Sequence, residues 1–580
     1  MNQNPVRQTF DSISTPGAAR SELASWAWVF YVPGVLFCVL YVICMYFTPV
    51  ALVPIFGHDD GHFMRQGVEL TRGHWVGGYS HMTLIKGPGL PIFLALSHFF
   101  GLPYPISIAL AESGSFFLLS FVVGRLAKAP ALALFILVVL LSFPWVWSGD
   151  SLRVLRDGLY TSQLFIFLAL SFATIWGEQK PRAYFAFAAG VALGLLSITR
   201  EENPRLWPAV AFLIFAFFVA ERRRAGGLRV ISLILMWAAI GLVGVRGTIL
   251  TIHYAKYKLF EVTDIGEPNF RAALRALYSV ETSQRIPYLL VSREARSAIY
   301  DRSPIFARLR PLLDADEAPL KGWQEPGCQF YGGQVCGDYG GFWFVWALRD
   351  AVAMVGGYAN ARSASAFYRE ISKDIEHACE SKELSCRSAP IGDLPPLVRA
   401  NFVLMFSSAI NVVKLITLLT PLTAERLRSR GPADMIRPYA SFLHLTFWAP
   451  HADDPPDAIV SGTGQTLMIT LTLSTQNKIR DLYNAIWPVV CALGILAILF
   501  STYARLRTTG IDCLTVITWT FLILIATRIG LLSVIDATLF PAAYKEYATP
   551  AAYCLAAAIA IGLYSAVQDI RVPLFRGGHP

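Results

Sequence analysis

Charged residues are scarce in this chain: Asp, Glu, Lys and Arg make up 15% of its 580 residues, whereas hydrophobic residues make up 54%. The mean hydropathy is +0.48. Soluble globular proteins carry about 25% charged residues, so this composition excludes that class and indicates a membrane protein. The sequence also lacks an internal repeat, a P-loop, a GxGxxG after a strand, an HExxH and a GxSxG. Nucleotide hydrolysis, dinucleotide redox chemistry and serine hydrolysis therefore lose their usual sequence support.

Long apolar runs predict the fold. A run of roughly 18 or more apolar residues can cross a hydrocarbon core of about 30 Å as a helix. Such runs begin near Trp26, Ile106, Ala129, Gly158, Ala183, Leu206, Leu228, Tyr483, Cys513 and Tyr547. We predict an all-α polytopic membrane protein with about ten transmembrane helices. Its expected parts are a transmembrane domain (1–253), a mainly helical extracytoplasmic domain between the seventh and eighth spans (254–482), and C-terminal transmembrane helices with a short tail (483–580).

The positive charge indicates topology rather than a nucleic-acid partner. The net charge is +9, and most basic residues fall in short loops of one parity, for example Arg125 with Lys128 and Arg505 with Arg507. The positive-inside rule makes that side cytoplasmic. We therefore expect a multi-pass membrane protein with both termini on the cytoplasmic side. The apolar stretch after Trp26 is interpreted as an uncleaved anchor. Segment 401–420, which contains Lys414, is interpreted as an external amphipathic helix, because an eleventh span would invert every later loop.

The nine cysteines divide between two environments. Five lie in or at apolar runs, where a thiol is usually a small buried hydrophobe. The other four, Cys328, Cys336, Cys379 and Cys386, lie in the 254–482 domain. An even number of cysteines outside the cytoplasm favours disulfides, and local pairing of Cys328 with Cys336 and of Cys379 with Cys386 is the simplest of three connectivities. A zinc site is the alternative, although His377 alone lies nearby.

The loop after the first apolar run looks most like a chemical site. It reads GHDDGHFMRQGVEL and places Asp59 next to Asp60 before a helical pattern. Carboxylates at a membrane interface can act as a general base, hold a divalent cation such as Mg²⁺ or Mn²⁺, or cap a helix. Two adjacent aspartates exceed what one cap requires.

The same loop resembles the first external loop of the C-type superfamily of membrane glycosyltransferases. The shared pattern is an acidic pair, a short helix, a Gly-x-Trp ending at Trp75, and a Lys-x-Pro beginning at Lys86. The likeness is strongest to the protein-mannosyltransferase and aminoarabinose-transferase branch and to uncharacterised bacterial members. This chain has Gly-His-Trp and KGPG where that branch has Gly-Asp-Trp and Lys-Pro-Pro.

Later loops extend the resemblance. GDSLRVLRDGLY supplies Arg153, Arg156 and Asp157, ITREENPRLWP resembles an external loop of uncharacterised relatives, and ATRIGLLSVIDATLFPAAYKEYATPAAY resembles the late arginine-bearing span. The resemblance covers the first 250 residues well and the last 100 loosely. It implies three sets of site residues. The expected catalytic residues, of which the first two would hold any divalent cation, are Asp59, Asp60 and Asp157. Those for the donor phosphate are Lys86, Arg153, Arg156, Arg200 and Arg528, and those for the substrate are His62, Trp75, Glu201, Glu202 and Tyr547.

The arginines support a phosphate site independently of the resemblance. They lie at the external ends of spans, where basic residues are disfavoured unless they bind an anion. Guanidinium binds phosphate in a bidentate manner. The alternative is internal pairing, of Arg156 with Asp157 or Asp150, and of Arg200 or Arg205 with Glu201 or Glu202. The Lys86 side chain could likewise extend to the membrane interface without binding a phosphate. The histidines of the first loop fit hydrogen bonding better than the coordination of a metal ion.

The sequence thus favours an enzyme that transfers a hexosyl or pentosyl group from a polyprenyl-phosphate carrier, in contact with membrane lipid, to an unknown lipid, glycan or protein acceptor. Two alternatives remain. One is a transporter or lipid-binding protein that recognises an anionic solute, which predicts ionisable residues deep in spans and paired halves with discontinuous helices. The clearest residue of that kind in the sequence is Arg246. The other is a polysaccharide polymerase or ligase that uses a lipid-diphosphate donor.

Overall fold

The chain is helical throughout the part that the structure describes. This computed structural model describes residues 26–55, 58–147, 152–177, 181–201, 206–222, 226–387, 399–423, 428–451, 466–508 and 510–576. In these ranges the only β-type pairings are isolated bridges, such as that between Ala51 and Arg153. The all-α prediction is therefore confirmed.

Nine helices of the described residues are long and apolar enough to cross a membrane. The first span joins a π-helical turn (Ala27–Tyr31) to α2 (Val32–Tyr46). The others are α5 (Tyr104–Ala127), α6 (Pro130–Ser142) with the turn Pro144–Trp147, α7 (Asp157–Trp176), α8 (Arg182–Thr199), α10 (Gly227–Tyr257), α20 (Thr466–Arg507), α21 (Cys513–Thr538) and α22 (Lys545–Arg576). The run expected near Leu206 forms α9 (Trp207–Glu221), whose 15 residues fall short of a full crossing. The polytopic membrane fold is thus confirmed.

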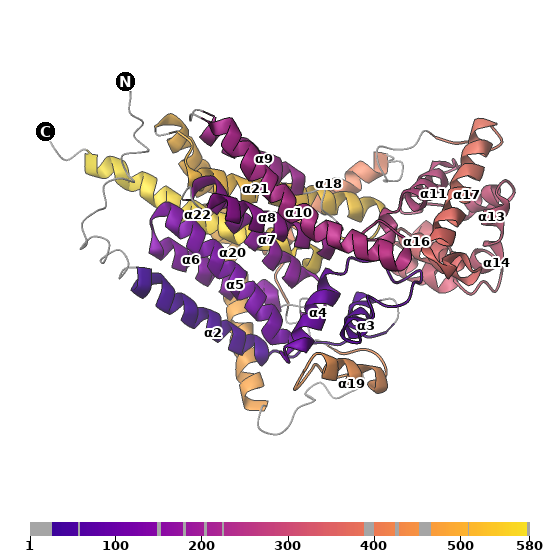
Figure 1. Cartoon of the computed structure of the whole chain (residues 1–580), viewed down its shortest axis with the longest axis horizontal. Coiled ribbons are helices and arrows are strands. Elements are labelled where there is room, and N and C mark those ends of the chain that lie inside the picture. The colour runs from indigo at the N-terminus through magenta and orange to yellow at the C-terminus, as the bar shows by residue number, and fades with distance from the viewer. Residues whose placement is uncertain are drawn as a thin grey trace.

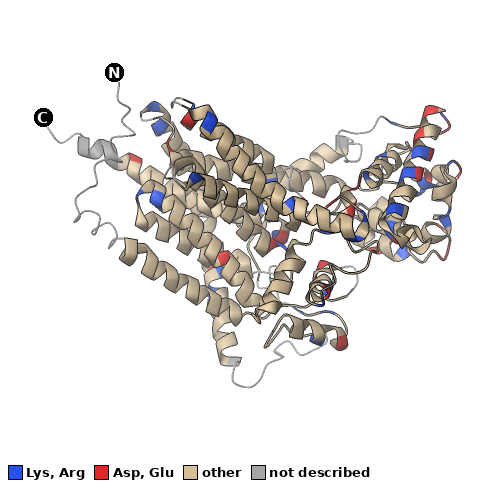
Figure 2. Ribbon diagram, viewed as in Figure 1, with Lys and Arg blue, Asp and Glu red and all other residues tan. Residues whose placement is uncertain are grey.

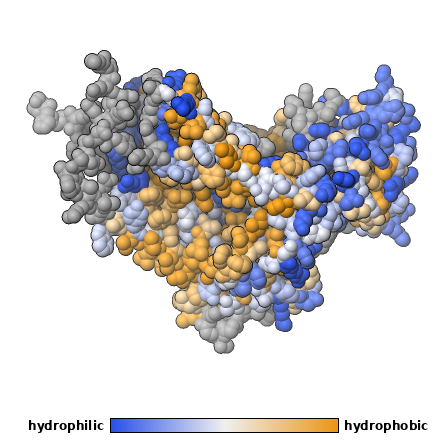
Figure 3. Space-filling view, viewed as in Figure 1, coloured by the Kyte–Doolittle hydropathy of each residue, from blue (hydrophilic) through white to orange (hydrophobic). Residues whose placement is uncertain are grey.

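Small residues allow neighbouring spans to pack backbone to backbone. A Cβ added to Gly190 of α8 would overlap the Ala238 carbonyl of α10, and one added to Gly241 of α10 would overlap the Phe187 carbonyl of α8. Glycines at such positions are typical of membrane helix interfaces, where close approach replaces a hydrophobic driving force. Figure 1 shows the spans as a bundle of long helices, and Figure 3 shows a mostly apolar surface over them.

A second helical lobe lies beyond one end of the spans, at the right of Figure 1. We call it the α11–α17 region. Its helices are α11 (Pro268–Ser279), α12 (Arg293–Tyr300), α13 (Pro304–Ala307), α14 (Arg310–Leu313), α15 (Gln324–Tyr331), α16 (Trp343–Met354) and α17 (Ala361–Glu380). They enclose a hydrophobic core of their own, which includes Phe270, Phe344 and Ile371. The surface here is hydrophilic, and Figure 2 shows many charged residues in the lobe. The domain boundaries at 254 and 482 stay predictions.

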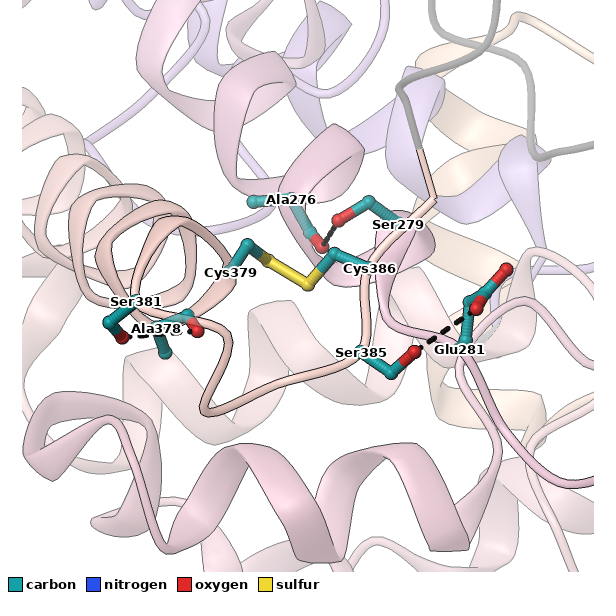
Figure 4. The surroundings of a disulfide bond; sticks show 8 residues. All are labelled: Ala276, Ser279, Glu281, Ala378, Cys379, Ser381, Ser385 and Cys386. Carbon is teal, nitrogen blue, oxygen red and sulfur yellow. Dashed lines mark hydrogen bonds between the residues drawn. A yellow bond between two sulfur atoms is a disulfide. The ribbon is translucent and has the colours of Figure 1, made fainter.

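Two disulfides close short loops in this region. Cys328 joins Cys336, with Cα atoms 4.4 Å apart, and Cys379 joins Cys386, with Cα atoms 5.6 Å apart. This is the local pairing that the sequence favours over a zinc site. Figure 4 shows the second bridge, which fastens the end of α17 to the segment that follows it, and the nearby hydrogen bond from the Ser385 hydroxyl to Glu281 (3.1 Å).

Four further helices pack outside the lobe. The segment 401–420 lies mostly in α18 (Arg399–Ile416), which packs along α21, and Asn401 Nδ2 donates to the Ala537 carbonyl (2.8 Å). The amphipathic helix α3 (Asp59–Thr71) packs against α4 (Gly89–Phe99). Helix α19 (Ala433–Phe442) covers them, since an added Cβ at Gly67 would meet the Phe442 ring at 2.9 Å. Residues 428–451 thereby brace the helix that begins with the acidic pair.

A buried ionic clamp fastens the α11–α17 region to the first loop. Arg349 of α16 is fully buried, and its Nη2 donates to the His81 carbonyl and to Asp264 Oδ2 (2.8 Å). His81 Nε2 lies 3.0 Å from Asp350 Oδ1, and the Asp264 amide donates to the Leu84 carbonyl (2.8 Å). Because breaking a buried pair leaves an uncompensated charge, this clamp fixes the loop relative to the lobe.

Candidate active site

The acidic pair begins helix α3 without capping it. The N-cap residue is His58, with no side-chain capping bond, and Asp59 and Asp60 are the first two helical residues. Their carboxylates lie in the first turn, where the helix dipole favours negative charge. The capping interpretation therefore does not account for either side chain.

Asp60 is buried in a bidentate pair. Its side chain is 0% exposed, and it accepts from Arg153 Nε (3.1 Å) and Nη2 (2.5 Å). Gly61 makes this burial feasible, because an added Cβ would lie 2.5 Å from the Pro54 carbonyl oxygen. Burial raises the pKa of Asp60 to about 6, although Arg153 opposes the shift. Asp60 therefore holds Arg153 in place and offers no face to a substrate.

The Asp59 side chain, in contrast, is partly exposed to solvent. Its side chain is 39% exposed and lies 3.4 Å from Lys86 Nζ. Burial acts to raise its pKa, but Lys86, Arg156 and His62 outweigh burial and lower the pKa to about 2. Asp59 is therefore the accessible, ionised member of the acidic pair.

The KGPG turn after Lys86 fits because two of its residues lack side chains. A Cβ at Gly87 would overlap the Ile198 carbonyl, and a Cβ at Gly89 would overlap the Thr199 hydroxyl. The turn consequently lies directly on the end of α8, where the Gly87 amide donates to Glu201 Oε1 (2.8 Å). This contact brings Lys86 and Glu201 into one site.

The arginines of the second and third loops pair across the loops. Arg156 Nη1 donates to both Glu201 oxygens (2.9 and 2.8 Å) and to the Thr199 carbonyl (3.1 Å), and Arg200 pairs with Asp157. Burial would raise the pKa of Glu201, but Arg156, Lys86 and the Gly87 amide lower it. Internal pairing thus occurs, although Arg156 takes Glu201 and Arg200 takes Asp157, instead of the partners within each loop.

Aromatic rings complete the surroundings of the guanidinium groups. Arg156 lies over the Phe63 ring (5.3 Å) and Arg200 over the Tyr547 ring (5.6 Å). Arg528 is buried and donates from Nε to the Tyr547 carbonyl (2.6 Å). Tyr547 therefore links the late arginine of the sequence pattern to the Arg200–Asp157 pair. Figure 2 shows charged residues clustered where the spans end near α3 and α4.

Three predicted residues stand apart from these pairs. His62 is buried, burial lowers its pKa to about 4, and its Nε2 has no partner among the described residues. Trp75 packs edge-on against His253 of α10, with ring centroids 5.8 Å apart. Glu202 lies outside the described residues, as do Asp150 and Arg205.

The acidic pair fits a divalent cation poorly. Both Asp60 oxygens accept from Arg153, and Asp59 faces Lys86, so each carboxylate already has a cationic partner. Among the described residues no group of three His, Cys, Asp or Glu side chains could hold a metal ion.

Sequence reasoning missed one carboxylate. Glu112 lies within α5, is 4% exposed and accepts from the Tyr41 hydroxyl (2.6 Å). A glutamate inside an apolar run was the available signal, because charged residues in spans are rare and mark function. Arg246, the residue selected on that criterion, lies on α10, where its charge acts on Glu261.

Comparison with known proteins adds one structural likeness. No family model and no curated protein matches the chain. The crystal structure of ArnT from Cupriavidus metallidurans bound to undecaprenyl phosphate aligns with 92% of this chain and 77% of that chain, at 14% sequence identity and a TM-score of 0.31.

These contacts define a compact site with alternating charge. Its members come from the loops before α3, α4 and α7 and after α8, which the bundle brings to one end of the spans. The ion pairs are Asp59–Lys86, Asp60–Arg153, Arg156–Glu201 and Arg200–Asp157. Such an arrangement can receive an anion if a cation exchanges its carboxylate for the ligand, and it leaves Asp59 free to accept a hydrogen bond.

Proposed function

We propose that this protein is a membrane glycosyltransferase that moves a sugar from a polyprenyl-phosphate carrier to an acceptor hydroxyl or amine. The carrying observation is the set of four ion pairs gathered at one end of the spans, three of which join different loops. For ion pairs that are largely buried, the desolvation penalty can exceed the Coulombic gain, so a cluster of this kind is poorly explained by folding alone. A phosphate at headgroup depth would exploit the same cations.

The carboxylates take different roles in this proposal. Asp59 is exposed and ionised, so it would accept the hydrogen bond of the acceptor group and guide its proton to water. Asp60 would hold the Arg153 guanidinium in position and would not contact the substrate, because the Asp60 side chain is fully buried. In the reaction the bond from the anomeric carbon to the phosphate oxygen breaks, and a bond to the acceptor oxygen or nitrogen forms. The phosphate keeps the electron pair and leaves as an anion.

Lys86 is the cation best placed to receive the phosphate. Its pair with Asp59 is long, at 3.4 Å, and its side chain is 21% exposed. Arg156 and Arg200 are 8% and 3% exposed in their side chains and are held by aromatic rings. Lys86 would therefore exchange partners first, and the arginines would stabilise the developing negative charge from fixed positions.

We place the site on the outer face of the cytoplasmic membrane. The distribution of basic residues in the sequence supports this orientation, which puts both termini inside and the α11–α17 region outside. The clamp of Arg349 on the first loop would then set the α11–α17 region beside the site, where it could position the acceptor.

The transporter hypothesis gains support from Glu112, because a buried carboxylate in a span is expected on a solute path. It predicts uptake or release of an anionic solute by vesicles that contain the protein. The glycosyltransferase proposal predicts no such flux.

The test of the proposal is chemical. Deleting the gene should change the polyprenyl-linked sugars of the membrane, as measured by mass spectrometry of extracted lipids. Wild-type protein should restore the normal pattern and Asp59→Asn should not, because loss of a positioned base costs about a hundredfold to ten-thousandfold in rate. The matched control is Asp316→Asn, which removes an exposed carboxylate outside the site. An unchanged lipid pattern after deletion, or full rescue by Asp59→Asn, would contradict the proposal.

A further inference from the structure

Helix α10 leaves much of its apolar surface uncovered by the rest of the chain. Its exposed side chains include Leu233, Trp237, Ile240 and Val243. In a helix that crosses a membrane, such side chains contact the acyl chains of lipids. Arg246 follows this apolar stretch and is itself half-buried. A basic residue in that position is costly unless an anion accompanies it.

The depth of Arg246 follows from the packing of α10 against α8. The preceding residue, Val245, lies against Gly194, because a Cβ added there would meet the Val245 Cβ at 2.7 Å. Gly194 lies five residues before Thr199, the last residue of α8, which corresponds to about 8 Å at 1.5 Å per residue. The Arg246 backbone therefore lies close below the end of the spans that holds the candidate site. From there its long side chain can extend to the level of the lipid headgroups.

A carboxylate lies near Arg246 because the chain turns back beside α10 after that helix ends. The His253 ring contacts the Glu261 carbonyl oxygen through Nδ1 (2.7 Å). The next residue, Val262, packs with Ile249 of α10 in one hydrophobic cluster. Glu261 is half-buried and is thus held beside the last turns of α10.

Arg246 and Glu261 interact electrostatically without forming an ion pair. Burial raises the pKa of Glu261 and Arg246 opposes the shift, while Glu267 and Arg271 act on this pKa with opposite signs. Within the described ranges, neither the Arg246 nor the Glu261 side chain forms a salt bridge or a hydrogen bond. A guanidinium and a carboxylate thus lie near one another at the lipid-facing surface, and each lacks a direct partner among the described residues.

Two exposed aromatic rings lie beyond these charges. Arg246 and Tyr254 share one face of α10, because they are eight residues apart and residues at four-residue spacing lie above one another on a helix. The Tyr254 ring meets the Phe260 ring edge-on, with centroids 6.5 Å apart, and both side chains are more than half exposed. Exposed aromatic residues at the end of a span are typical of the headgroup level of a bilayer.

We propose that Arg246 and Glu261 bind the headgroup of a phospholipid that carries both a phosphate and a primary ammonium, as phosphatidylethanolamine does. The phosphate accepts hydrogen bonds from the planar guanidinium, and the ammonium, which a short linker holds nearby, donates to the carboxylate. The acyl chains lie along the exposed apolar side chains below Arg246. A purely anionic headgroup is disfavoured because Glu261 repels it. This lipid site is separate from the ion pairs of the candidate active site and does not rest on the proposed function.

The test measures lipid binding to the full chain in detergent by native mass spectrometry, after the co-purified lipids have been removed. Palmitoyl-oleoyl phosphatidylethanolamine and palmitoyl-oleoyl phosphatidylcholine are titrated in parallel. They share acyl chains and a phosphate, whereas the trimethylammonium group of phosphatidylcholine has no N–H to donate. Wild type should bind its first phosphatidylethanolamine about tenfold more tightly than its first phosphatidylcholine, as expected for one hydrogen bond between charged groups.

Two variants assign this preference to the proposed residues. Glu261→Gln should bind the two lipids alike, because glutamine keeps the size of the side chain and removes its charge. Arg246→Gln should bind both lipids about tenfold more weakly, because the phosphate loses its guanidinium. The matched control is Arg229→Gln, which removes an exposed arginine near the other end of α10 and should keep the wild-type preference.

The wild-type titration decides the matter even if a variant does not fold. Equal affinity of wild type for the two lipids would overturn the proposal. A preference that survives in Glu261→Gln, or undiminished binding in Arg246→Gln, would also overturn it. Soluble glycerophosphoethanolamine at the same concentration should not displace the bound lipid, and displacement would refute the role of the acyl chains on α10. No sugar donor is present, so these results do not depend on transfer activity.

Discussion

Replacing Asp60 with asparagine should change stability and activity with opposite dependence on pH. The side chain is 0% exposed, and burial raises its pKa from 3.8 to about 6. Two pKa units correspond to about 3 kcal/mol. Because the folded state binds the proton more tightly than the unfolded state, this stabilisation is fully present below about pH 4 and is lost as the pH rises through about 6.

Asp60→Asn lacks that titration, so the free energy of unfolding of wild type should fall relative to the variant by about 3 kcal/mol between pH 4 and pH 7. Thermal unfolding midpoints of the purified proteins across this range measure the difference. Asp59→Asn is the matched control, since the pKa of Asp59 is lowered to about 2. The contribution of Asp59 is present above about pH 4 and is lost only as the pH falls through about 2, so the control difference should stay constant.

Sugar transfer should show the reverse trend. The Arg153 guanidinium needs an ionised Asp60 to hold it, so wild-type activity should rise with pH through about 6. In Asp60→Asn the activity should be low and should lack this acid limb. A stability difference between wild type and Asp60→Asn that does not change between pH 4 and pH 7 would refute the assignment of Asp60 as a buried, proton-binding carboxylate.

Three further predictions follow from the described contacts. Gly87→Ala should lower transfer activity at least tenfold with little loss of expression, because the added Cβ overlaps the Ile198 carbonyl and displaces Lys86; wild-type kinetics in this variant would argue against the close approach. Cysteines introduced at the exposed positions Asp316 and Asp434, in a background without the free native cysteines, should both react with an impermeant thiol reagent from outside, and protection of the second alone would make α18 a span. Non-reducing mass mapping of protein from the membrane should find the two local disulfides, whereas four free thiols there would exclude them.

The sequence predicted the parts of this molecule that depend on local pattern. The apolar runs located the spans, and the pattern after Asp59 located α3. The apolar run that begins near Leu206 predicts a span, but α9 comprises only the 15 residues from Trp207 to Glu221, where the run gives way to charged residues and Glu221 pairs with Arg182 of α8. A run of this length lies just below what a membrane crossing requires, so hydropathy alone does not decide it.

The partners of the charged residues could not be predicted in the same way. Arg156 and Asp157 are neighbours in sequence, yet each pairs with the end of α8, because the α7 and α8 termini converge there. The two aspartates of the acidic pair looked equivalent, and only packing against Pro54 and Arg153 distinguishes the buried Asp60 from the exposed Asp59. Sequence can nominate such residues, whereas tertiary structure assigns them their different environments.

The buried clamp of Arg349 couples the position of the α11–α17 region to the geometry of the candidate site. Arg349 holds the carbonyl of His81, and only four residues of chain separate His81 from Lys86. Any displacement of the lobe, such as that imposed by a bulky acceptor seated on it, must therefore either break a desolvated ion pair or carry the Lys86 turn with it. The α11–α17 region and Lys86 would then move together, so a ligand that displaces one would also displace the other.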